Sequence, residues 1–184
     1  MDPAGGGIAF NFDSALEIGQ SIALAGTARN VTQIDLYLGD NTSDAFKVRF
    51  YNLGQANGQP SDLIWESAEI QYPYTPPYYN QKVISVPVPG VAVPDELAWS
   101  VVPVDPTSAG NLLVWTGSLL PSIGSHLHYW ERLSNLSWNS NLFSNGTFGA
   151  KLFAVPEPST FALVVIALAA LPLRRRKSVP NNRV

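Results

Sequence analysis

The stretch that decides the fold class is Val-Thr-Gln-Ile-Asp-Leu-Tyr-Leu, residues 31–38. Its side chains alternate between two faces. Val31, Gln33, Asp35 and Tyr37 would lie on one face, which is the more polar, and Thr32, Ile34, Leu36 and Leu38 on the other. A period of two is typical of a half-buried β-strand. A second alternating run follows at residues 45–53, after a turn rich in Gly, Asp, Asn and Ser. It sets Phe46, Val48 and Phe50 against Lys47, Arg49 and Tyr51. Two such runs around a short turn predict a β-hairpin.

Similar β-prone runs continue along the chain. They lie at residues 63–70, 82–88, 96–104, 112–116 and 147–154, and turn-forming residues separate them. The Pro- and Tyr-rich stretch 72–79 is unsuited to a central strand, and the Ser-, Asn- and Gly-rich stretch 117–146 has no clear assignment. About eight short strands predict an all-β body, a β-sandwich of jelly-roll type. Trp65 and Trp99 lie in strands and are expected in its core.

Composition and charge exclude several function classes. The 184 residues correspond to about one domain. The absence of cysteine excludes disulfides, cysteine–zinc sites and thiol catalysis. Residues 1–155 carry six basic and thirteen acidic residues, a net charge of −7, whereas residues 156–184 carry +4. The acidic body argues against nucleic-acid binding, because it repels a phosphate backbone.

The C-terminal segment has three parts in a fixed order. Pro156, Glu157 and Pro158 are followed by an apolar run, residues 161–173, and then by Arg174, Arg175, Arg176 and Lys177. The larger side chains of the run are Phe161, Leu163, Val164, Val165, Ile166, Leu168, Leu171 and Leu173. As a helix the run would span about 20 Å, which Ser159, Thr160 and snorkelling arginines extend toward the ~30 Å of a bilayer core. A single transmembrane helix at about residues 160–173, with the basic cluster in the cytoplasm, is therefore expected.

This tail resembles the PEP-CTERM sorting tail of exported bacterial proteins, which is also labelled an ice-binding protein C-terminal domain. The resemblance covers about residues 154–177 and implies that the membrane transpeptidase exosortase cleaves near Pro156-Glu157-Pro158. It also implies release of the body to the cell surface, in hosts that make extracellular polysaccharide. A plain tail anchor is the alternative. Residues 35–38, 46–51, 58–60 and 63–65 loosely resemble choice-of-anchor β-sandwich modules.

Three segments follow from this interpretation. Residues 1–153 would be the extracytoplasmic body, residues 154–177 the sorting and anchor segment, and residues 178–184 a cytoplasmic tail. Export requires a signal peptide, but the first ten residues contain neither a basic nor a long apolar region. We therefore expect the signal peptide to lie upstream of this start. The protein would pass through the inner membrane, contact its lipids through the helix, and reach the cell surface.

Two polar clusters could hold a metal ion. His126 and His128 would share one face of a strand, with Glu131 as a third zinc ligand, but two surface histidines in a polar loop are the favoured explanation. Residues 40–44 offer alternating oxygen ligands as calcium loops do, yet lack the rest of an EF-hand, and a turn accounts for them. No metal or cofactor is predicted.

The chain has no catalytic signature that spacing alone identifies. It lacks a Gly-x-Ser-x-Gly elbow, and its carboxylates cannot be paired across a cleft from sequence. We therefore expect no enzymatic activity. The alternative to a non-catalytic surface protein is a carbohydrate-binding module, because aromatic side chains in or near loops could stack on sugars. These are Tyr72, Tyr74, Tyr78, Tyr79, Trp115, Tyr129, Trp130 and Trp138.

Overall fold

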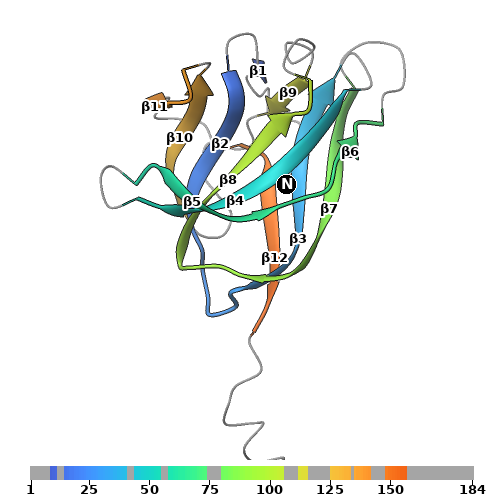
Figure 1. Cartoon of the computed structure of the whole chain (residues 1–184). Coiled ribbons are helices and arrows are strands. Elements are labelled where there is room, and N and C mark those ends of the chain that lie inside the picture. The colour runs from blue at the N-terminus through green and yellow to red at the C-terminus, as the bar shows by residue number, and fades with distance from the viewer. Residues whose placement is uncertain are drawn as a thin grey trace, which may run out of the picture.

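The computed structural model describes residues 9–11, 15–40, 44–54, 58–73, 80–105, 112–115, 125–133, 135–141 and 148–156. Within these residues the chain forms twelve β-strands in two antiparallel sheets and no helix (Figure 1). The prediction of an all-β fold is confirmed. In Figure 1 the sheet that contains β4 lies in front of the sheet that contains β3 and β12.

The larger sheet has β2 and β8 at its centre. In spatial order its strands are β11 (Trp138–Asn141), β10 (Ser125–Leu133), β2 (Ala15–Ala23), β8 (Glu96–Pro103), β4 (Ala45–Leu53) and β5 (Pro60–Glu66), and β6 (Ile70–Gln71) also pairs with β4. The register sets Gly19 of β2 opposite Ser100 of β8. These two strands carry the site described below.

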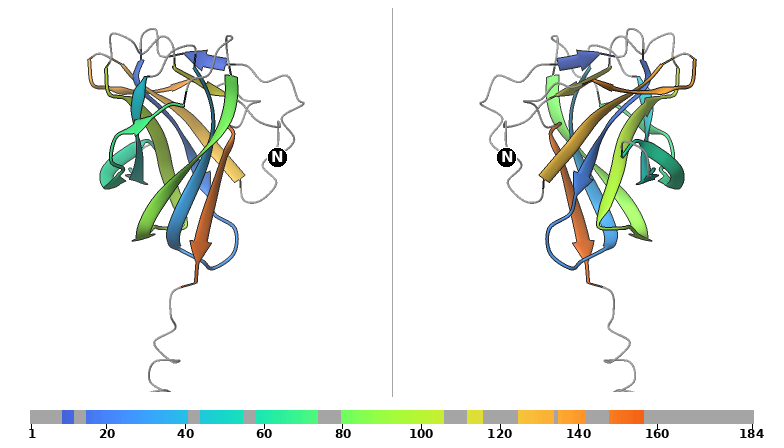
Figure 2. Two further views of the ribbon diagram at one scale, coloured as in Figure 1. Left: turned by 90° about the vertical axis from the view of Figure 1, so that its right-hand side faces the viewer. Right: turned by 90° about the vertical axis from the view of Figure 1, so that its left-hand side faces the viewer.

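The smaller sheet is built around β3 (Asn30–Asp40). One side of β3 pairs with β12 (Ala150–Val155) and β9 (Leu112–Trp115), and the other side pairs with β7 (Asn80–Ala92). The short strand β1 (Ala9–Asn11) adds to β9. Two further views of the strands are given in Figure 2.

One hydrophobic core lies between the two sheets. The smaller sheet contributes Ile34, Leu36, Leu38 and Val86, and the larger sheet contributes Phe46, Val48, Phe50, Leu97, Trp99 and Val101. Trp99 is fully buried, and Trp65 packs on Phe50 with 5.0 Å between ring centroids. Both tryptophans therefore lie in or against the core, as their strand positions predicted.

The predicted hairpin between residues 31–38 and 45–53 is wrong. β3 lies in the smaller sheet and β4 in the larger, so the connection between them crosses from one sheet to the other. A hairpin and a sheet crossing need the same turn-forming residues, and local pattern does not distinguish them. The assignment of Val31 to the polar face also fails, because a bulge between Val31 and Gln33 turns Val31 into the core.

Four strands escaped the sequence interpretation, and one of them is the short β1 at residues 9–11. β2 is a central strand, but Gln20 interrupts the apolar face formed by Ile18 and Ile22. The buried polar side chain of Gln20 has a partner inside the fold, since its Oε1 accepts a hydrogen bond from the Phe148 backbone amide at 3.2 Å. β10 and β11 both lie in the stretch 117–146 that had no assignment.

The last strand leads directly into the predicted sorting motif. β12 ends at Val155, two residues beyond the predicted body boundary, and both Val155 and Pro156 are exposed. Among the described residues there is no helix long and apolar enough to cross a bilayer. The predicted transmembrane segment lies in residues 157–184, outside the described part of the chain.

Candidate functional site

The outer face of the larger sheet has a floor of small residues. Gly19 and Ser21 on β2 lie opposite Ser100 and Ala98 on β8. Larger side chains from flanking strands cover this floor, because short ones leave room above it. Trp130 of β10 donates a hydrogen bond to the Ser21 hydroxyl. Ser21, Ala98 and Ser100 are consequently buried although they face away from the main core.

An aromatic contact closes over the floor from both sides. Tyr51 of β4 and Trp138 of β11 meet edge to face with 5.7 Å between ring centroids. In the sheet, β4 and β11 are separated by the three strands β8, β2 and β10. Neighbouring strands lie about 4.8 Å apart, so these side chains can meet only by reaching across the floor. The outer face therefore has a small packed layer of its own.

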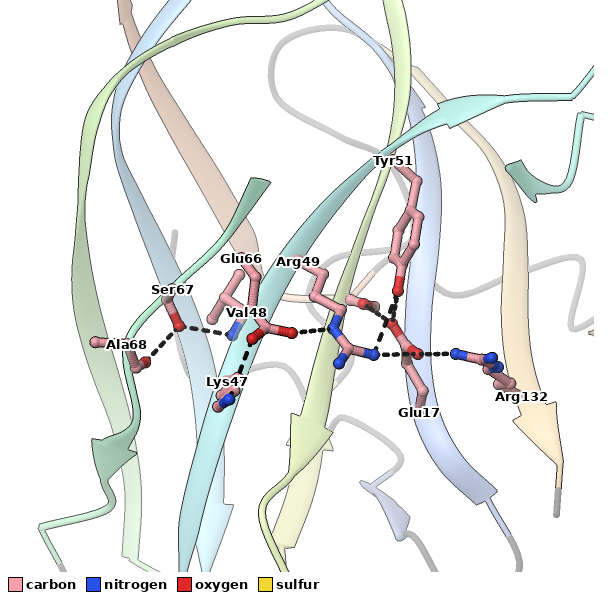
Figure 3. Close-up of polar contacts among 10 residues, drawn as sticks. Glu17, Lys47, Val48, Arg49, Tyr51, Glu66, Ser67, Ala68 and Arg132 are labelled. Atoms are coloured by element: carbon pink, nitrogen blue, oxygen red, sulfur yellow. Dashed lines mark hydrogen bonds and ion pairs between the residues drawn. The ribbon is translucent and has the colours of Figure 1, made fainter. Parts of the chain in front are cut away.

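Glu17 lies in this layer and is only 1% exposed. Its Oε1 accepts hydrogen bonds from the Tyr51 hydroxyl at 2.7 Å and the Ser100 hydroxyl at 2.5 Å. Its Oε2 accepts from Nη1 of Arg49 at 3.1 Å and Nη1 of Arg132 at 3.4 Å. Figure 3 shows the two arginines on opposite sides of the carboxylate. A buried charge requires such paired partners, since burial without them costs several kcal/mol.

A second carboxylate extends the network to the edge of the sheet. Arg49 Nε donates to Glu66 Oε2 at 2.7 Å, and Lys47 Nζ donates to Glu66 Oε1 at 3.1 Å. The hydrogen bond from Arg49 lowers the pKa of Glu66, against the opposing effect of burial. Burial, followed by the charge of Glu17, raises the pKa of Tyr51, so its hydroxyl remains a donor to Glu17.

The lowered pKa of Glu66 predicts a pH dependence of stability. The ionised form is favoured in the folded state, so its contribution is present above the unfolded pKa of about 4.3 and is lost as pH falls through the lower folded value. Between pH 5 and pH 3, we expect the free energy of unfolding to fall less in Glu66→Gln than in the natural protein. Urea unfolding at both pH values measures this. An equal fall in both proteins would contradict it.

An open pocket of about 220 Å³ lies beside Glu17. Its wall is apolar, formed by Leu16, Val102, Pro103 and Leu136, and its charged lining residues are Glu17, Arg49 and Arg132. The Arg132 guanidinium also lies over Trp138, with 5.8 Å from Cζ to the ring centroid. We call this feature the Glu17 pocket.

No family model, curated protein or solved structure matches the chain.

The predicted histidine pair lies partly outside the described residues, because the side chain of His126 is not among them. The backbone register opposes His126 to Ile22 and His128 to Ser21, with an irregularity between them. Within the described residues no group of three or more His, Asp or Glu side chains could hold a metal ion. The proposed calcium turn lies mostly at residues 41–43, which are outside that part.

Several aromatic residues predicted near loops are not available to a ligand. Tyr72, Tyr129 and Trp130 are buried, and Tyr129 packs against Phe148 in the core. The side chains of Tyr74, Tyr78, Tyr79 and Trp115 lie outside the described set. Of the eight predicted aromatics, Trp138 alone is both described and half-buried, and it packs against Tyr51.

Sequence reasoning missed the residues that form the Glu17 pocket. The outward orientation of Lys47, Arg49 and Tyr51 was predictable from alternation and is confirmed by their contacts. Glu17 and Arg132 are separated by 115 positions and meet only through the pairing of β2 with β10. A lone Glu between apolar residues in a β-prone run was the only available signal.

Proposed function

We propose that this protein is an exported, non-catalytic surface or matrix protein whose tail is a PEP-CTERM signal processed by exosortase. The observation that carries this proposal is the order Pro156-Glu157-Pro158, apolar run, Arg174–Lys177. Within the proposal, the body is a jelly-roll-like β-sandwich. The chain passes repeatedly from one sheet to the other, as in β2 to β3, β3 to β4 and β7 to β8, which supports that topology.

The position of the motif suits cleavage beside a membrane. β12 ends one residue before Pro156, and both Val155 and Pro156 are exposed. Two prolines fix φ and remove backbone donors, so we expect an extended motif. An extended strip between a folded body and a bilayer is accessible to a membrane-embedded transpeptidase. The apolar run would contact membrane lipid until exosortase releases the body.

The tail makes a direct prediction about processing. In a host with exosortase, we expect the mature protein to lack residues from about 156–159 onward, and Glu157→Ala to leave full-length precursor in the membrane. Glu157 is the only acidic residue of the tail segment, so its loss removes a distinctive recognition feature. Mass spectrometry of the surface and membrane fractions measures both results.

The matched control is Glu69→Ala, which removes an exposed carboxylate from the body. It should be processed like the natural protein. Recovery of an intact peptide from residues 174–184 in the mature surface protein would mean that the tail is retained as a plain anchor. Unchanged processing of Glu157→Ala would show that the motif is not what exosortase recognises.

A further inference from the structure

We propose that the Glu17 pocket binds a sugar ring that carries a carboxylate, such as a uronate. The pocket is open and has a volume of about 220 Å³. Ligand sites of this kind combine an apolar wall with a few polar groups that fix orientation, and the pocket has both.

Hydrogen-bond donors in the pocket exceed the acceptors. A carboxylate offers about four acceptor positions, and Glu17 already accepts from Tyr51, Ser100, Arg49 and Arg132. Arginine carries five N–H donors, yet within the described part of the chain Arg132 makes one hydrogen bond to a side chain, at 3.4 Å. Its buried Nε has no partner among the described residues. The Arg132 side chain is 30% exposed, so its terminal N–H groups, rather than the buried Nε, are the donors that a further acceptor could reach.

The charge balance favours a monoanion. Lys47, Arg49 and Arg132 outnumber the two carboxylates of this network, Glu17 and Glu66, by one positive charge. This local excess stands out in a segment whose net charge over residues 1–155 is −7. A planar carboxylate matches the guanidinium fork geometrically. One excess charge suits a carboxylate better than a dianionic phosphate.

One residue of the apolar wall has a backbone conformation that is unfavourable for a bulky side chain. Leu136, in the turn between β10 and β11, has φ of 65° and is 62% exposed. A bulky side chain in this region costs about 1 kcal/mol, and Gly or Asn would suit the turn better. The leucine lines the Glu17 pocket together with Val102 and Pro103. Its side chain is thus positioned to contact the C–H face of a ring whose carboxylate lies against Arg132.

The source of such a ligand rests on the proposed function, because only an exported body would meet extracellular acidic polysaccharide. The chemistry of the pocket does not depend on it. A free sugar acid and a uronate within a polysaccharide present the same carboxylate and ring.

The test is an isothermal titration calorimetry experiment on the full-length chain in a zwitterionic detergent. The probes are D-glucuronate, D-glucose, acetate and an oligouronate. We expect saturable binding of glucuronate, with glucose and acetate each about tenfold weaker because one lacks the charge and the other the ring. Binding of the oligouronate as well would identify a polysaccharide as the source, and binding of the monosaccharide alone a free sugar acid. Absence of saturable glucuronate binding, or equal binding of glucose, would overturn the inference.

Two variants locate the binding in this pocket. Arg132→Lys keeps the positive charge but removes the fork, and should weaken glucuronate binding about tenfold. Leu136→Asn suits the positive φ, so the thermal midpoint should stay or rise while the affinity falls about fivefold through loss of the apolar wall. A purely structural role of Leu136 would change stability without changing affinity.

The matched control is Arg29→Lys, which alters the Arg29–Asp95 ion pair beyond the opposite end of β2 and should bind like the natural protein. Natural affinity in both Arg132→Lys and Leu136→Asn would overturn the assignment. Tail processing is measured on another part of the chain. If the protein binds glucuronate but keeps its tail, this inference stands and the proposed function fails. If the tail is processed but glucuronate does not bind, the proposed function stands and this inference fails.

Discussion

Gly19→Ala is expected to destabilise the body by about 3 kcal/mol, at the upper end of overpacking costs. A Cβ at Gly19 would lie 2.2 Å from the Trp99 backbone oxygen and 2.8 Å from Ser100 Cβ. The first of these neighbours is backbone in the central pair of the larger sheet, so the clash cannot be relieved by a side-chain rotation. The two strands would have to separate where Gly19 pairs with Ser100.

The matched control for this prediction is Gly54→Ala. A Cβ there meets its nearest neighbours at 3.4–3.7 Å, an ordinary contact, and Gly54 has no positive φ. Urea unfolding followed by tryptophan fluorescence compares the two variants with the natural protein. Equal midpoints for Gly19→Ala and Gly54→Ala would show that β2 and β8 do not approach as closely as the structure has them.

Glu17→Gln is expected to lower the free energy of unfolding by about 3 kcal/mol, because removing one partner of a buried ion pair leaves its counter-charges uncompensated. The side chain keeps its size, but it loses its charge and one of its two acceptor oxygens becomes an NH2 donor. Arg49 and Arg132, at 22% and 30% exposure, would lose their shared carboxylate oxygen. Arg49 would keep its ion pair with Glu66, whereas Arg132 would keep no ion pair within the described part of the chain.

Two further variants sharpen this prediction. Glu96→Gln removes an exposed carboxylate at the start of β8 and should change stability by less than about 0.5 kcal/mol. Combining Glu17→Leu with Arg132→Met should recover part of the loss, because it removes the unpaired charge of Arg132, although the hydroxyls of Tyr51 and Ser100 still lose their acceptor. If Glu17→Gln were no more destabilising than Glu96→Gln, the network around Glu17 would not stabilise the fold.

The buried network shows why a charged residue in a strand was hard to interpret from sequence. Arg49 was expected on the outward face of its strand, and its contacts with Glu17 and Glu66 place it there. An outward face is usually solvated, yet here Glu17 is buried on it. The difference arises because Gly19, Ser21, Ala98 and Ser100 form a floor that larger side chains can cover. Only the pairing of β2 with β8 brings those four together.

The sequence by itself determined the all-β class, the inward set Phe46, Val48 and Phe50, and the core position of Trp99. Each follows from alternation, which is local because successive side chains of a strand point to opposite faces. The order of the tail segments can likewise be read directly from the linear sequence. Tertiary structure alone decided that β3 and β4 belong to different sheets, and that Glu17 meets Arg132 across 115 positions. Strand partners and register depend on contacts between distant segments, and no local pattern specifies them.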